Sequence, residues 1–127
     1  MGPPSSGGLT LLQILGLLER FPLSTLKPES TQAVHLFAEA GRLAYADRGL
    51  YMADADFVPV PVNELIDPEY LCDRAKLINP QRALTDAEPG KLPSKQLVWG
   101  QDNSIEFPST SHATIVDRNG NAVSMTT

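Results

Sequence analysis

Residues 108–127 read Pro-Ser-Thr-Ser-His-Ala-Thr-Ile-Val-Asp-Arg-Asn-Gly-Asn-Ala-Val-Ser-Met-Thr-Thr. The run from Ser111 to Asp117 alternates in the way that a β-strand does. The Asn119-Gly120 dipeptide indicates a two-residue hairpin turn, because both central residues of a type I′ turn need positive φ angles. Residues 121–127 then supply the returning strand. This stretch therefore predicts a β-hairpin, which sets the β part of the fold.

Thr110 stands where this hairpin begins, after a long polar stretch. In an intact chain its hydroxyl has no adjacent base, and a threonine at the start of a strand is most often a β-former with a local hydrogen bond. If the chain were cut before Thr110, however, one residue would carry both a hydroxyl nucleophile and a free amine. The residues alone favour the structural interpretation and leave the catalytic one open.

Two long helices are expected upstream. Residues 9–20 are apolar on nearly every side, which is typical of a buried helix, and Phe21-Pro22 ends it. A second helix is expected from about Pro28, which suits a first turn, to about Arg48. Gly41 weakens this helix by about 1 kcal/mol relative to Ala and indicates a close helix crossing. The apolar stripe of the second helix is formed by Leu36, Ala40, Leu43 and Ala44.

The rest of the chain is expected to be less regular. Residues 51–61 combine acidic and proline patterns that favour an extended connection. Short helices are expected at 63–66 and at 68–78, the second capped by Asp67. Residues 79–107 are rich in proline and show no sustained apolar period, so we expect a tail or linker that does not pack.

Composition excludes several classes of function. The chain has 127 residues, of which 42% are hydrophobic, and this is enough for one globular core. Its net charge is -5 without a basic block, so nucleic acid is not an expected partner. The single cysteine, Cys72, cannot form an internal disulfide and is expected to fill a helix face. The apolar run 9–18 is shorter than the roughly 20 residues that span a bilayer, and neither a membrane segment nor a signal peptide is expected.

Three weaker candidates for a binding site are interpreted as structural. Residues 5–8 precede a helix but lack the lysine and the strand of a phosphate-binding loop. Asp54 and Asp56 begin like a calcium loop, but the later glycine and glutamate are missing. His35 has no partner at ligand spacing. No metal or cofactor is therefore expected.

Three blocks of sequence frame nearly the whole chain. They are Pro3–Gly8 running into Leu11–Leu15, Ala38–Arg48, and Thr110–His112 with Val116–Asp117 and Gly120–Ser124. Each block alone is a weak motif. In this order and at this spacing they resemble the γ-glutamyltranspeptidases, a family of self-cleaving enzymes among the N-terminal-nucleophile hydrolases.

The resemblance implies a two-stage chemistry. In a precursor, the Thr110 hydroxyl attacks the carbonyl of Ser109, and hydrolysis of the resulting ester splits a large subunit from a small one. The new α-amino group of Thr110, with an ordinary pKa of about 7.7–8.0, then serves as base for its own hydroxyl. That hydroxyl attacks a γ-glutamyl donor such as glutathione, and the acyl group passes to water or to an acceptor amino acid or peptide.

Two neighbours of the nucleophile are candidates for supporting roles. Ser111 stands where many family members carry a second threonine, and it keeps the hydroxyl. His112 is interpreted as a packing or orienting residue. The family's substrate-gripping residues and oxyanion hole lie outside these residues, and loss of one such donor costs about 100- to 1,000-fold in rate. The chain alone is therefore expected to have no transferase activity.

The expected fold is α+β, a fragment of the family's four-layer αββα sandwich, mostly helical with a C-terminal β-hairpin. Residues 1–78 would be the helical end of the large subunit, 79–109 its proline-rich tail, and 110–127 the first hairpin of the small subunit. A two-stranded ribbon is marginal alone, so it must lie on the helices, pair with another copy or stay poorly ordered. The remaining parts of both subunits are the implied partners.

Alternative functions stay open. The chain is also compatible with a non-catalytic helical module that binds a partner or self-associates. Within the family, a related acylase that removes glutaryl side chains from β-lactam precursors shares the threonine-or-serine start. For a bacterial member, the resemblance is compatible with an exported or periplasmic location, which these residues do not decide.

Overall fold

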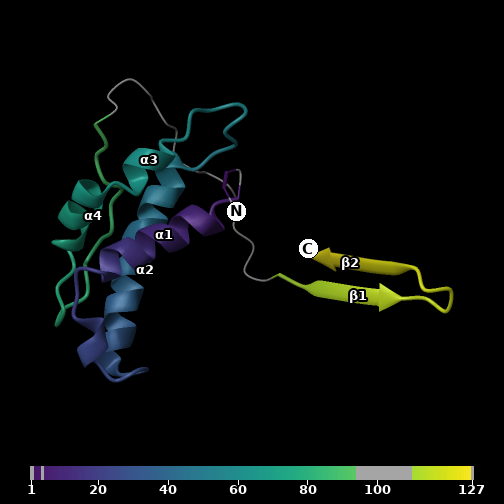
Figure 1. Ribbon diagram of the computed structural model, residues 1–127, viewed down its shortest axis with the longest axis horizontal. Coiled ribbons are helices and arrows are strands. Elements are labelled where there is room, and N and C mark those ends of the chain that lie inside the picture. The colour runs from purple at the N-terminus through teal and green to yellow at the C-terminus, as the bar shows by residue number, and fades with distance from the viewer. Residues whose placement is uncertain (1, 4, 94–109, 127) are drawn as a thin grey trace.

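The computed structural model describes residues 2–3, 5–93 and 110–126. A helical block is followed by a two-stranded antiparallel sheet (Figure 1). The elements are, in chain order, α1 (Gly7–Leu18), a short 3-10 turn η1 (Leu23–Thr25), α2 (Thr31–Tyr51), α3 (Val62–Leu65), α4 (Pro68–Ala75), β1 (His112–Val116) and β2 (Ala122–Thr126). The expectation of a mostly helical chain with a C-terminal hairpin is confirmed for these residues.

The core of the helical block lies where α1 packs against α2 and α4 packs against α1. Ile14 and Leu17 of α1 and Leu71 of α4 meet the apolar stripe of α2 in one buried cluster. Burying a side chain such as leucine contributes about 1.5–3 kcal/mol, so this cluster is the main apolar source of stability. The predicted stripe is confirmed, because no more than 1% of each residue is exposed at Leu36, Ala40, Leu43 and Ala44.

Local sequence signals set where the helices begin. Ser30 precedes α2, and its hydroxyl accepts a hydrogen bond of 3.3 Å from the backbone N–H of Ala33. Asp67 precedes α4, and its carboxylate accepts from the backbone N–H groups of Glu69 and Tyr70 at 2.9 and 3.1 Å. These bonds satisfy donors that the first helical turn leaves unpaired. The predicted Asp67 cap is confirmed.

The prediction that α1 is a buried helix is wrong for one of its sides. Its side toward α2 and α4 is buried, but three leucines on the other side are close to half exposed. They are Leu11, Leu12 and Leu15. The reason is geometric, because the elements that pack most extensively on α1 are α2 and α4, and both lie on its buried side.

The prediction of a close helix crossing at Gly41 is also wrong. A Cβ placed on Gly41 would have no atom within 4 Å, so this glycine faces open space. The close approach lies at Gly16 of α1, where a Cβ would stand 2.5 Å from Cδ1 of Leu71 in α4. The sequence places a glycine in each of the two helices. Only the packing shows that Gly16 has no room for a side chain and that Gly41 does.

Residues 84–90 form a strap along the helical block, so the prediction that 79–107 does not pack is wrong for this part. Arg42 of α2 donates to the carbonyl oxygens of Leu84 and Thr85 at 2.6 and 3.3 Å. Glu39 accepts from the backbone N–H of Leu84 at 2.7 Å. The strap is thus held through its backbone by charged side chains. Residues 94–107 lie outside the described residues.

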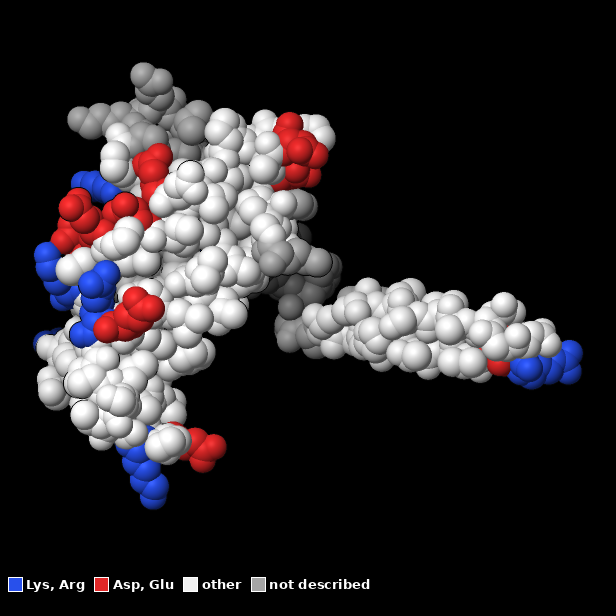
Figure 2. Space-filling view, viewed as in Figure 1, with Lys and Arg blue, Asp and Glu red and all other residues white. Residues whose placement is uncertain are grey.

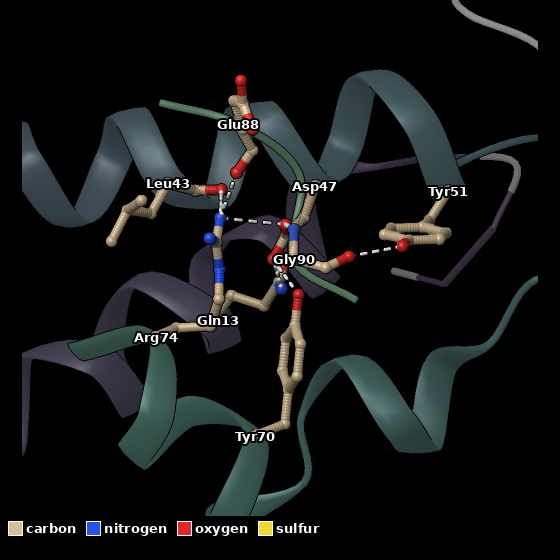
Figure 3. Close-up of polar contacts among 8 residues, drawn as sticks. All are labelled: Gln13, Leu43, Asp47, Tyr51, Tyr70, Arg74, Glu88 and Gly90. Atoms are coloured by element: carbon tan, nitrogen blue, oxygen red, sulfur yellow. Dashed lines mark hydrogen bonds and ion pairs between the residues drawn. The ribbon is translucent and has the colours of Figure 1, made fainter. Parts of the chain in front are cut away.

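The end of the strap is fastened by a buried carboxylate (Figure 3). Asp47 of α2 is 1% exposed. Its Oδ1 accepts from Arg74 at 3.0 Å and from the backbone N–H of Gly90 at 2.8 Å. Its Oδ2 accepts from Gln13 at 3.0 Å and from the Tyr70 hydroxyl at 2.8 Å. One side chain therefore ties α1, α2, α4 and the strap together.

Two tyrosines complete this cluster. The hydroxyl of Tyr51 donates to the carbonyl oxygen of Gly90. Burial, followed by the negative charge of Asp47, raises the pKa of the Tyr70 hydroxyl well above its usual range. The hydroxyl therefore stays protonated and remains a donor to Asp47 throughout the physiological pH range. Arg74 also donates to the Glu88 carbonyl at 2.9 Å, which adds a second link to the strap.

We expect Gly90→Ala to destabilise the chain by about 1–3 kcal/mol, because the new methyl group would overlap the Tyr70 hydroxyl and approach Arg74 Cδ to 2.8 Å. Gly41→Ala is the matched control and should stabilise by about 1 kcal/mol, because it replaces a helical glycine in open space. Urea unfolding followed by circular dichroism measures both changes. Equal effects of the two substitutions would contradict the assigned packing.

Candidate processing and nucleophile site

The hairpin that follows Thr110 pairs β1 and β2 in a single antiparallel register. His112 lies opposite Thr126, Thr114 opposite Ser124, and Val116 opposite Ala122. All its described residues are exposed, and none of the described helices lies over either face (Figure 1). The hairpin is almost free of charge, with Asp117 and Arg118 gathered at its tip (Figure 2).

The turn is not the predicted two-residue type I′ turn. Within the described residues only Gly120 among the turn residues has a positive φ, of 84°, whereas a type I′ turn needs a second one at Asn119. The N–H of Gly120 donates to the carbonyl of Asp117 at 3.1 Å, and the N–H of Asp117 donates to the carbonyl of Asn121 at 2.9 Å. The connection is therefore a three-residue loop that ends in a left-handed glycine.

The Asp117 carboxylate explains why this longer loop is preferred. It accepts from the backbone N–H groups of Asn119 and Asn121 at 2.8 and 2.9 Å and from the Asn121 side chain at 2.8 Å. The side-chain bond from Asn121, followed by the backbone bonds, lowers the pKa of the Asp117 carboxyl below its usual value. A side chain that organises its own turn in this way outweighs the preference of an Asn-Gly pair.

The two faces of the hairpin differ in chemistry, because successive strand residues point to opposite sides. One face carries apolar side chains, and the opposite face carries an imidazole and three hydroxyls near the open end of the hairpin. The apolar face consists of Ala113, Ile115, Val123 and Met125. The polar face includes His112, Thr114, Ser124 and Thr126.

Thr110 is exposed and lies two residues before the first residue of β1. If the extended backbone continues back through Ser111, the Thr110 side chain falls on the same side as His112. In the described part of the chain, no side-chain base is hydrogen-bonded to the Thr110 hydroxyl. Ser109, the predicted donor of the scissile carbonyl, lies outside the described residues. The roles of Ser109, Thr110 and Ser111 stay predictions.

His112 contacts hydroxyl groups on both strands. Its Nδ1 lies 2.8 Å from Thr126 Oγ1, and its Nε2 lies 3.1 Å from Thr114 Oγ1 and 3.0 Å from Ser124 Oγ. Sequence reasoning singled out His112 and missed these three partners. The alternation of β1 was enough to place Thr114 on the same face as His112. The partners on β2, Ser124 and Thr126, depend on the strand register, and the predicted two-residue turn would have shifted that register.

The weaker candidate sites have ordinary structural contacts. The Ser6 hydroxyl accepts from Arg48 Nε at 2.9 Å, and Asp54 accepts from the backbone N–H of Asp56 at 3.0 Å. His35 Nε2 lies 2.8 Å from the carbonyl oxygen of Asn79. Among residues 2–3, 5–93 and 110–126, no three His, Cys, Asp or Glu side chains are grouped to hold a metal ion. None of the described helices is long and apolar enough to cross a membrane.

Comparison with known proteins finds relatives that are named as proenzymes. It is 41% identical over 126 residues to a glutathione hydrolase proenzyme of Pseudomonas sp. (strain A14), covering 98% of this chain and 20% of that protein. It is 42% identical over 124 residues to the acylase ACY 1 proenzyme of Pseudomonas sp. (strain SE83), with the same coverage of 98% and 20%. The chain thus spans about a fifth of the length of these relatives, 20% in each case.

The fold agrees with the sequence comparison. The gamma-glutamyltranspeptidase of Helicobacter pylori superposes with a TM-score of 0.68 and 44% sequence identity, over 79% of this chain and 28% of that chain. The model of the gamma-glutamyltranspeptidase family matches residues 1–127. The chain therefore belongs to the gamma-glutamyltranspeptidase family, and the resemblance of its three sequence blocks is confirmed.

The lowered pKa of Asp117 predicts a pH dependence of the loop. A carboxyl whose folded pKa is depressed stabilises the structure above its unfolded pKa, about 3.9, and this contribution is lost as pH falls through the lower folded value. An NMR titration of Asp117 should therefore give a midpoint below about 3.9. Asn121→Ala, which removes the side-chain donor, should move it upward. A midpoint at or above 3.9 in the unsubstituted chain would contradict the assigned bonds.

Proposed function

We propose that this chain is a segment of a precursor that cleaves itself between Ser109 and Thr110. The observation that carries the proposal is the position of Thr110, an exposed hydroxyl residue at the start of a hairpin, in a chain that matches the family over residues 1–127. Relatives named as proenzymes support a processing step. Here the large subunit ends at Ser109 and the small subunit begins at Thr110.

The cleavage begins as an acyl shift. The Thr110 oxygen bonds to the Ser109 carbonyl carbon, the bond from that carbon to the Thr110 nitrogen breaks, and the hydroxyl proton ends on the departing amine. Water then hydrolyses the ester, which leaves a carboxylate on Ser109 and restores the hydroxyl. The amine that is released has an ordinary pKa of about 7.7–8.0, so it is partly unprotonated near neutral pH and can act as a base.

In the mature protein the same hydroxyl attacks the γ-glutamyl amide of a donor such as glutathione. The donor's amine leaves, and a γ-glutamyl ester forms on Thr110. Water or an acceptor amino acid or peptide then takes the acyl group. The name glutathione hydrolase, carried by a relative 41% identical to this chain, supports this class of donor.

The complete site needs residues beyond this segment. Together with this segment, the remaining parts of both subunits would form a four-layer αββα sandwich. In it the hairpin would be one piece of a sheet, and the helical block would cover one side of the sandwich. Such residues would cover the exposed apolar side chains of the hairpin and supply the donors for the oxyanion. Each missing donor costs about 100- to 1,000-fold in rate, so residues 1–127 alone should be inactive.

A second activity has a specific observation in its favour. The acylase ACY 1 proenzyme is 42% identical to this chain, which is as similar as the glutathione hydrolase at 41%. In this second proposal, Thr110 would be the same nucleophile acting on a different acyl group. This segment therefore supports the nucleophile and the processing bond equally for both activities, and the choice of acyl group is made elsewhere in the protein.

Thr110→Ala in the full-length precursor should leave a single uncut band on a denaturing gel, because the nucleophile of the acyl shift is gone. The unsubstituted precursor should give two bands, and N-terminal sequencing of the smaller should begin at Thr110. Ser109→Ala is the control on the other side of the bond. It should still be cut, because Ser109 contributes only its backbone carbonyl.

Two results would contradict the proposal. One is a smaller band whose sequence begins at a residue other than Thr110. The other is self-cleavage of purified Thr110→Ala at the rate of the unsubstituted precursor.

A further inference from the structure

One imidazole joins three hydroxyls at the open end of the hairpin. His112 Nδ1 is 2.8 Å from Thr126 Oγ1 on the opposite strand, in the last described register pair. Its Nε2 is 3.0 Å from Ser124 Oγ, also on the opposite strand, and 3.1 Å from Thr114 Oγ1 on its own strand. Both edges of the ring are therefore held, and two of the three contacts cross from β1 to β2.

The partners fix the direction in which the ring points. Thr114 and Ser124 lie two register pairs further from Thr110 than His112 does, so Nε2 faces away from the nucleophile. Nδ1 faces across to Thr126. A hydroxyl can either donate or accept, so each ring nitrogen has a hydrogen-bond partner whichever nitrogen carries the proton. This geometry suits a residue that holds the strands, and it does not direct a ring nitrogen toward the Thr110 hydroxyl.

We propose that His112 is a positioning residue for Thr110, acting through its bridge to Thr126 and Ser124. This inference rests on the proposed function, in which Thr110 is the nucleophile. The ends of a two-stranded ribbon open easily, and Thr110 lies just beyond the last described pair. A bridge at that pair keeps the start of β1 on β2 and so restricts where the Thr110 hydroxyl lies.

Such a bridge is expected to affect the rate of the chemical step, kcat. An error of about 1 Å in the position of a reacting group can cost about 100-fold in rate, because the attacking oxygen must lie within a narrow distance and angle of the carbonyl. On the proposed function, residues outside this segment bind most of the substrate. Loss of the bridge should therefore lower kcat and leave KM nearly unchanged.

The chain offers a matched pair of substitutions for the test. Thr126→Val and Thr114→Val each remove one hydroxyl bonded to the His112 ring and keep a β-branched side chain of the same size. Only Thr126 lies on the opposite strand. In the processed full-length protein, Thr126→Val should lower kcat about tenfold with KM within about twofold, whereas Thr114→Val should change kcat by less than about twofold.

Combination with His112→Ala identifies the bridge itself. This substitution should lower kcat at least as much as Thr126→Val does, about tenfold or more, and Thr126→Val added to it should have little further effect, because His112→Ala already removes the contact to Thr126. His112→Asn, whose amide keeps a polar group near the position of Nδ1, should recover part of the loss. The pH midpoint of kcat should stay unchanged in all these variants, because the Thr110 amine is the base.

Each outcome decides the inference. Equal kcat losses in Thr126→Val and Thr114→Val, or additive losses in the double variant, would overturn the bridge. Disappearance of the pH midpoint in His112→Ala would make His112 the base and would also overturn it. Failure of the proposed function gives a different result, because Thr110→Ala would then still be cut and active whatever the His112 variants do.

Discussion

The buried carboxylate of Asp47 is the interaction on which the helical block depends. Burying an unpaired charge costs several kcal/mol, and this cost is offset only when hydrogen bonds satisfy the charge. Here four donors meet Asp47, from Gln13, Tyr70, Arg74 and the backbone of Gly90. The four come from α1, α4 and the strap, so the ion pair specifies one arrangement of segments that apolar packing alone would leave less defined.

The hairpin shows the opposite condition. Its apolar side chains have no cover, and more than half of each is exposed at Ile115, Val123 and Met125. The helical block satisfies its own buried polar groups, apart from Nε of Arg74 among the described side chains. The proposed function explains both the satisfied helical block and the uncovered hairpin. The helices form a unit that packs internally, whereas the hairpin belongs to a sheet that other residues complete.

Local sequence rules predicted what local interactions determine. The stripe of α2, the Asp67 cap and the hairpin follow from period, capping chemistry and turn residues. The strap did not follow, because Arg42 and Arg74 bind its backbone carbonyls and such bonds leave no period in the sequence. Gly16 and Gly41 look alike in the sequence of a helix, and only the neighbouring helix distinguishes them.

The prediction of the turn type was wrong because the Asp117 side chain competes with the preference of Asn119-Gly120 for a two-residue turn. Thr110 itself came from the resemblance of three blocks, since no local rule separates it from a structural threonine.

The most direct measurement is the identity of the residue that carries the acyl group during turnover. The processed full-length protein would be mixed with a γ-glutamyl donor, quenched in acid within the first turnover, and digested for peptide mass spectrometry. The account predicts a γ-glutamyl ester on the hydroxyl of Thr110, at the first position of the small subunit. An acyl group on any other residue, or turnover without an acylated residue in the quenched protein, would contradict it.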